Sequence, residues 1–181
     1  MIKIVSLILA SLLALSSAHA EGFTLSSKTI SGQLGIQQVY NSFGCTGKNI
    51  SPELSWSGAP SGTKSYALTM YDPDAPTGSG WWHWLVFNID SKSTKLLSGA
   101  GDVKNKTAPK GSVQSINDYG SLGFGGACPP VGQGTHQYIF TIYALDTDKI
   151  SLDEKANQAV VGFMIKSHTI AKASLVAYYG H

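Results

Sequence analysis

A length of 181 residues with 43% hydrophobic side chains predicts one globular domain that is long enough to bury a sizeable core. The formal net charge is only +2 and the chain contains no arginine, which argues against a nucleic-acid partner and excludes an arginine clamp on phosphate. Charged residues make up 13% of the chain, while 20 glycines and 7 prolines predict many turns.

Residues 1–20 have the composition of a secretory signal peptide. Lys3 supplies the positive start, residues 4–15 form an apolar segment, and Ala18-His19-Ala20 fits a cleavage site. The apolar segment is shorter than the ~20 residues that a membrane-spanning helix needs. We therefore expect cleavage after Ala20, a single domain over residues 21–181, a periplasmic location and no membrane span.

Most of the remaining chain predicts short strands separated by turn residues, which is typical of an all-β domain. The final part of the chain adds a helical pattern, because Ser151 and Glu154 have capping-box spacing and apolar residues then recur at helical intervals. Gly162 is expected to divide this segment, so the fold has one or two short helices near the C-terminus. Strands are expected over residues 23–25, 54–56, 66–71, 83–89, 137–145 and 173–179.

Three of these strands carry a polar residue at one end of an apolar face. Alternate residues share a face, so Asp72 ends the file of Tyr66, Leu68 and Met70. If neighbouring strands run antiparallel, Asp72, His83 and His136 meet at one sheet end above an apolar floor, as in many ligand sites. Each residue could instead be a turn former or solvated. The other two predicted files are His83, Leu85, Phe87 and Ile89, and His136, Tyr138, Phe140 and Ile142.

Two further features concern the loops. Residues 118–134 are rich in glycine, which lets a backbone approach a ligand closely or form an anion-binding nest of N–H groups; a long surface loop is the alternative. Cys45 and Cys128 are the two cysteines, and an even number in an exported protein favours a disulfide over free thiols or a zinc site.

Several motifs resemble those of the phosphatidylethanolamine-binding proteins, also called Raf kinase inhibitor proteins. The resemblance covers essentially the whole chain after residue 20 and is nearest to the bacterial branch of the family. It is carried by Asn49-Ile50-Ser51-Pro52, by Asp72-Pro73-Asp74-Ala75-Pro76 with Trp82-His83-Trp84-Leu85-Val86, and by Cys128-Pro129-Pro130 with Gly134-Thr135-His136-Gln137-Tyr138.

The resemblance implies a large antiparallel sheet packed on a smaller one, with a small pocket for phosphate, acetate or a phospholipid head group. It also implies a homodimer that is not an enzyme and has no cofactor. Trp82 replaces a histidine common in eukaryotic members, so a kinase-inhibitor role is not expected. The ligand-binding residues that the resemblance implies are Asp72, Asp74, Pro76, His83, Pro130, His136 and Tyr138.

The first functional hypothesis is therefore an anion-binding pocket in which Asp72 favours charged imidazolium groups, so that affinity falls as pH rises. Two alternatives remain. A protein–protein effector would bind a protease, receptor or host factor and keep the pocket as a vestige. A metal-dependent hydrolase would use the histidines and aspartates as ligands, although they lack the close spacing of common zinc hydrolases.

Overall fold

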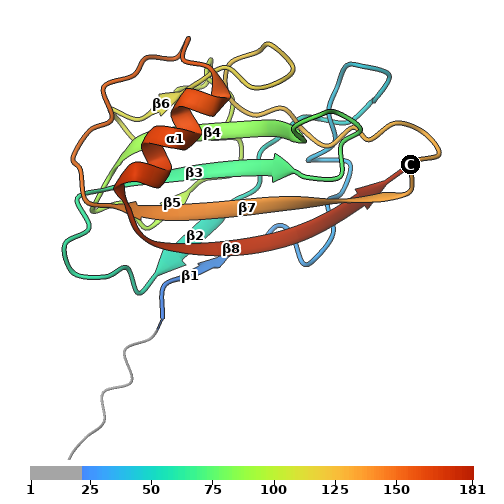
Figure 1. Cartoon of the computed structure of the whole chain (residues 1–181). Helices are drawn as coiled ribbons and strands as arrows, with labels where there is room; N and C mark the ends of the chain where they lie inside the picture. The colour runs from blue at the N-terminus through green and yellow to red at the C-terminus, as the bar shows by residue number, and fades with distance from the viewer. Residues whose placement is uncertain (1–21) are drawn as a thin grey trace, which may run out of the picture.

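The computed structural model describes residues 22–181, so the predicted signal peptide and its cleavage site lie outside the described residues. Two antiparallel sheets form the domain (Figure 1). The small sheet has the strand order β1-β2-β5 and the large sheet has the order β6-β4-β3-β7-β8. The elements are β1 Thr24–Ser26, β2 Leu54–Ser57, β3 Ser65–Asp72, β4 Trp81–Asp90, β5 Lys95–Leu96, β6 Val113–Gln114, β7 Thr135–Leu145, α1 Gln158–His168 and β8 Thr169–Gly180.

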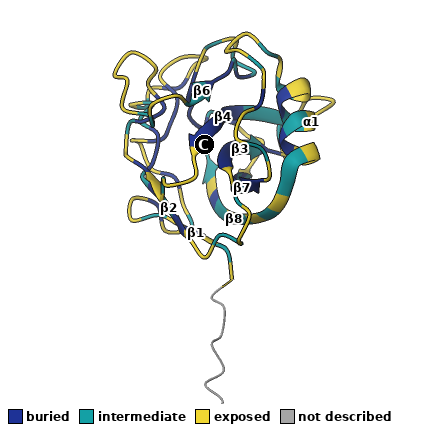
Figure 2. Ribbon diagram, turned by 90° about the vertical axis from the view of Figure 1, so that its left-hand side faces the viewer, coloured by how far each residue is buried: buried dark blue, intermediate teal, exposed yellow. Residues whose placement is uncertain are grey.

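This architecture confirms the all-β prediction of a large sheet packed on a smaller one, and each predicted strand lies within an observed one or overlaps it. The main core fills the space between the sheets, where Leu54 and Trp56 of β2 meet Leu68 and Phe140 of the large sheet. Figure 2 shows the corresponding dark, buried segments of β3, β4 and β7 at the centre of the molecule.

Helix α1 covers the opposite face of the large sheet (Figure 1). Its buried residues Val161 and Ile165 pack on Leu85 and Phe87 of β4. No helix within residues 22–181 is both long and apolar enough to cross a bilayer.

The predicted start of the helix is wrong. Asn157 is the N-cap, with its side-chain oxygen accepting from the Val160 N–H, and Gly162 lies inside a single helix. The segment around Ser151 stays outside the helix, because Asn88 binds both the N–H and the carbonyl of neighbouring Ile150. The capping-box spacing is therefore overruled by tertiary hydrogen bonds.

The predicted file on the second strand is also wrong, because β4 contains two bulges. Tyr71 pairs with Trp82 and Met70 pairs with Trp84, so His83 is the extra residue of the first bulge. A second register shift occurs opposite Ala67, where Asn88 has a positive φ of 58°. As a result Leu85 and Phe87 face α1, whereas the β4 residues that face the small sheet are Trp84, Val86 and Ile89.

Candidate functional site

The three predicted polar residues do converge at one end of the large sheet. Strand β3 runs antiparallel to both β4 and β7, so its C-terminal end lies beside the N-terminal ends of its two neighbours. His136 Nδ1 lies 2.8 Å from Asp72 Oδ2, and His83 is close enough to interact electrostatically with both. All three side chains are buried.

Asp72 is both a member of the site and a turn former, the two roles that the sequence left open. Its Oδ2 accepts from His136, while its Oδ1 accepts from the backbone N–H groups of Asp74 at 2.8 Å and Ala75 at 3.1 Å. The carboxylate therefore fixes the start of the loop after β3 and orients the imidazole of His136. Because a carboxylate accepts at Nδ1, the Nε2 of His136 is the ring nitrogen left for a ligand.

His83 is oriented by the glycine-rich segment. Its Nδ1 lies 2.8 Å from the Gly125 carbonyl oxygen and 3.1 Å from that of Gly126. Carbonyl oxygens only accept, so Nδ1 carries the proton and Nε2 is again the free ring nitrogen. At His83 this segment thus presents carbonyl oxygens and not the anion-binding nest that its composition allowed.

Burial lowers the pKa of His83 to about 4, although the Gly125 and Gly126 carbonyls and the charge of Asp72 act in the opposite direction. His83 is therefore neutral at pH 7 in the free protein. Asp72 favours the charged imidazole, as expected, but at His83 the loss of solvation outweighs this attraction, so the expected imidazolium does not form in the free protein.

A small pocket opens at this sheet end, with a volume of about 180 Å³. Five of the predicted residues line it: Asp72, Pro76, His83, Pro130 and His136. The remaining lining residues, which the sequence did not indicate as binding residues, are Phe43, Ala75, Thr77, Trp81, Tyr119, Cys128 and Pro129.

Two of the predicted binding residues do not line the pocket. Asp74 is exposed, and its Oδ2 accepts from the backbone N–H of Gln137 at 2.8 Å, which ties the loop after β3 to β7. Tyr138 is fully buried behind the pocket, with its ring 5.2 Å from the imidazole of His83 in an edge-to-face arrangement. Both residues support the site from outside.

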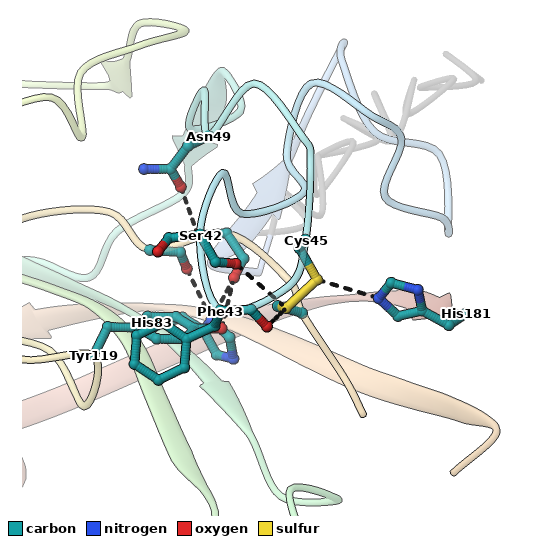
Figure 3. Close-up of a disulfide and its surroundings, with 10 residues drawn as sticks. Ser42, Phe43, Cys45, Asn49, His83, Tyr119 and His181 are labelled. Carbon is teal, nitrogen blue, oxygen red and sulfur yellow. Dashed lines mark hydrogen bonds between the residues drawn. A yellow bond between two sulfur atoms is a disulfide. The ribbon is translucent and has the colours of Figure 1, made fainter. Parts of the chain in front are cut away.

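One wall of the pocket is aromatic and is joined to the disulfide. Phe43 packs edge-on against Tyr119, with 5.1 Å between the ring centroids, and Trp81, the first residue of β4, packs edge-on against the same ring at 5.2 Å. The predicted disulfide between Cys45 and Cys128 is present, and it attaches the loop that carries Phe43 to the pocket (Figure 3).

Asn49 holds the glycine-rich segment against His83. Its Oδ1 accepts from Gly126 N–H at 2.7 Å, and its Nδ2 donates to the Phe124 carbonyl at 3.2 Å. The residue has a positive φ of 53°, a conformation in which asparagine is enriched. The Asn49 motif therefore serves the site by positioning the carbonyl groups that orient His83.

The pocket wall contains an uncharged donor, the indole N–H of Trp81. No lysine is among the residues that line the pocket. The Trp81 N–H is buried without a partner among residues 22–181, and so is the hydroxyl of Tyr138, which lies behind the pocket wall. Burial raises the pKa of Tyr138, which keeps that hydroxyl protonated. Unpaired buried polar groups are costly and usually mark a place for a water or ligand.

Comparison with known proteins gives a consistent result. Residues 26–180 match the family model described as phosphatidylethanolamine-binding protein. The UPF0098 protein YbcL of Escherichia coli is 49% identical over 165 residues, which is 90% of each chain, and YbhB of the same organism is 48% identical over 147 residues, 81% of this chain and 92% of YbhB.

Two solved structures share the fold. The crystal structure of Escherichia coli YbcL, described as a member of the mammalian PEBP family, superposes with a TM-score of 0.86 at 48% identity, covering 88% of this chain and 98% of YbcL. A homologue from Chlamydia trachomatis superposes with a TM-score of 0.69 at 30% identity, with the same coverage of 88% and 98%.

Proposed function

The chain belongs to the phosphatidylethanolamine-binding protein family, and we propose that its pocket binds a small phosphate- or carboxylate-bearing ligand such as a phospholipid head group. One observation carries the proposal. Two buried imidazoles, His83 and His136, each use Nδ1 on the protein and line the same pocket of about 180 Å³. That volume lies below the ~300 Å³ at which drug-sized ligand sites begin, which favours a head group or small anion.

Anion binding in this pocket requires a proton. The Nε2 of neutral His83 is an acceptor, so it repels an anion until it is protonated or until the ligand brings the proton itself. Asp72 would balance the positive charge on either imidazole. A protonated imidazole beside a bound anion is stabilised by the ion pair, so ligand binding and proton uptake support each other.

The charge of the site favours a weakly charged or zwitterionic ligand. Asp72 is buried in the pocket wall, Asp74 lies just outside it, and no lysine lines it, so a polyphosphate would find too few positive partners. The unpaired indole N–H of Trp81 supplies a neutral donor for an anionic oxygen. This balance supports a phosphodiester head group over a nucleotide phosphate.

Binding rather than catalysis is part of the same proposal. Of the side chains with a hydroxyl or a sulfur that line the pocket, Thr77 donates to the Gly80 carbonyl, Tyr119 donates to the Gly126 carbonyl and Cys128 is in the disulfide, so none is poised as a nucleophile. Both oxygens of Asp72 are already hydrogen-bonded within the protein, which disfavours the metal-hydrolase alternative.

We also propose that the protein works after export, as its first 20 residues and the Cys45–Cys128 disulfide together support. A homodimer remains a prediction. An effector role toward a protein partner is the main alternative, in which binding of that partner would not depend on His83.

The test is calorimetric titration of the exported form with glycerophosphoethanolamine and with inorganic phosphate. Wild type should bind, and a His83→Ala/His136→Ala double variant should lose binding by at least roughly a hundredfold. The matched control is His168→Ala, which removes a half-buried histidine of α1 outside the pocket and should bind as the wild type does. If the double variant retains wild-type affinity, the pocket proposal is wrong.

The pH dependence of the same titration tests whether ligand binding is coupled to proton uptake. The phosphodiester of glycerophosphoethanolamine keeps one charge across the acidic range, so a change in affinity reports the protein. Since free His83 has a pKa of about 4, affinity should fall by up to roughly tenfold per pH unit as pH rises above that value. A constant affinity between pH 5 and about 8 would contradict proton-linked binding.

A further inference from the structure

Three side chains with soft or borderline donor atoms meet at the outer end of the pocket wall. The ligand atoms of Cys45, Cys128 and His181 all lie within 4.8 Å of one another, and His181 Nε2 is 3.2 Å from Cys45 Sγ. Figure 3 shows His181 on the side of the disulfide away from Phe43 and Tyr119. The three residues come from segments far apart in sequence, so the meeting is a product of the fold.

These atoms are the donors that Zn²⁺ prefers. Two thiolates and an imidazole occur together in zinc sites that keep a fourth position open for water or another ligand. In the oxidised protein the sulfurs are bonded to each other and cannot act as thiolates. Reduction would supply both thiolates at the same place, with the imidazole of His181 already beside them.

We propose that Cys45, Cys128 and His181 form a redox-controlled site for a thiophilic divalent cation of the Zn²⁺ class. A dithiol reductant is oxidised to its disulfide as the Cys45–Cys128 bond is reduced to two thiols. The cation then replaces the two thiol protons, which leave to solvent, and His181 Nε2 donates its lone pair as the third ligand. A disulfide oxidant, itself reduced to a dithiol with two protons from solvent, re-forms the Cys45–Cys128 bond and so releases the cation.

The backbone holds the three ligands together without the disulfide. Residues 38–40 are bound to Ala127 by the Tyr40 N–H to Ala127 carbonyl and Ala127 N–H to Gln38 carbonyl hydrogen bonds, at 2.9 and 3.0 Å. The Cys45 N–H donates to the Ser42 carbonyl at 3.0 Å, which closes the loop. At the other end of the site, Gly180 pairs with Thr135 and fixes the approach of His181.

The geometry of the two cysteines can accommodate a tetrahedral metal ion. A tetrahedral zinc with Zn–S distances of ~2.3 Å separates its sulfurs by about 3.8 Å, which rotation of the two cysteine side chains can provide. The Cα atoms are 5.9 Å apart. Cys45 is buried, Cys128 is half-buried and His181 is exposed, so the ion can enter from the His181 side and leave one position facing solvent.

The test uses Co²⁺ alone as a spectroscopic probe, followed by competition with Zn²⁺. Under anaerobic conditions the reduced protein should develop a thiolate-to-cobalt charge-transfer band and tetrahedral d–d bands that Zn²⁺ abolishes, while the oxidised protein shows neither. His181→Ala should weaken binding by roughly tenfold or more. His168→Ala, which removes a half-buried histidine of α1, should bind Co²⁺ as the wild type does.

Folding of the reduced chain is measured alongside by near-ultraviolet circular dichroism. A folded, reduced protein without the bands overturns the proposal, as does a His181→Ala variant with wild-type affinity. Unfolding upon reduction, or in a Cys45→Ser/Cys128→Ser variant, also overturns it, because the backbone must hold the ligands. The His83→Ala/His136→Ala variant should bind Co²⁺ normally, which separates this site from the proposed ligand pocket.

Discussion

Two aspartate–histidine pairs with nearly the same geometry occupy different environments in this protein. Asp72 and His136 are 2.8 Å apart, with 4% and 3% of their side chains exposed. Asp146 and His168 are 2.9 Å apart, with 55% and 35% exposed. Comparing the two pairs separates the effect of the aspartate–histidine hydrogen bond from the effect of its burial.

The buried pair is part of a network and the exposed pair is a surface link. Asp72 accepts from two backbone N–H groups as well as His136, and both members line the pocket. Asp146 follows β7 and joins His168, the last residue of α1, through the side chains and through its own N–H to the His168 carbonyl at 2.9 Å. Burial removes competing water, so only the first pair is committed to a fixed orientation.

The largest expected effect on stability comes from replacing the aspartate of each pair. Asp72→Ala leaves a buried imidazole and two backbone N–H groups without their partner, so the free energy of unfolding should fall by about 3–5 kcal/mol. Asp146→Ala should cost at most about 1 kcal/mol. Urea denaturation measures both. Asp72→Asn, which keeps an oxygen for the Asp74 and Ala75 N–H groups, should fall between them; equal losses for Asp72→Ala and Asp146→Ala would show that burial is not decisive.

A second effect sharpens the comparison through His83, the other buried imidazole of the site. Its pKa is lowered from 6.5 to about 4, so between these values the unfolded chain binds a proton that the folded chain does not. The contribution of His83 to the free energy of unfolding is fully present above pH 6.5. It should fall by about 3 kcal/mol as pH drops to about 4.

Replacing His83 removes this dependence. Denaturant midpoints measured from pH 7 to pH 4 should decline less in His83→Gln than in wild type, since glutamine can donate to the Gly125 carbonyl without titrating. His168→Gln, which alters the exposed pair, should retain the wild-type decline. A decline of the same size in all three proteins would mean that His83 is not kept neutral by burial.

The meeting of Asp72 and His136 could be predicted from strand parity, which is a local rule, on the condition that the strands pair antiparallel, which the observed pairing of β3 with β7 confirms. The environment of His83 could not, because the bulges of β4 arise from pairing with β3 and no residue pattern marks the shift at His83. Phe43 and Tyr119 were missed for a related reason. They lie in loops and reach the pocket through aromatic packing and a disulfide whose consequences depend on the whole fold.

The helix shows the same limit. The spacing of Ser151 and Glu154 satisfies a local rule, but the segment is already bound elsewhere: Asn88 holds Ile150, and the Glu154 carbonyl accepts from the Ile116 N–H at 2.9 Å. Local rules thus succeed where the chain has no stronger tertiary partner. At the site, the predicted residues that failed to line the pocket, Asp74 and Tyr138, are likewise held by contacts that sequence does not encode locally.

The smallest expected effect is that of salt on the coupling energies of the two aspartate–histidine pairs. Surface charges are screened over about 10 Å at 0.1 M salt and about 3 Å at 1 M, whereas buried pairs are screened much less. A double-mutant cycle on Asp146 and His168 at pH 6 should therefore give a coupling of about 0.5 kcal/mol in low salt that approaches zero in 1 M NaCl. The corresponding cycle on Asp72 and His136 should give a larger coupling that salt barely changes. A salt-sensitive coupling for the buried pair would mean that water reaches it, and the fixed imidazole orientation on which the pocket proposal depends would then be lost.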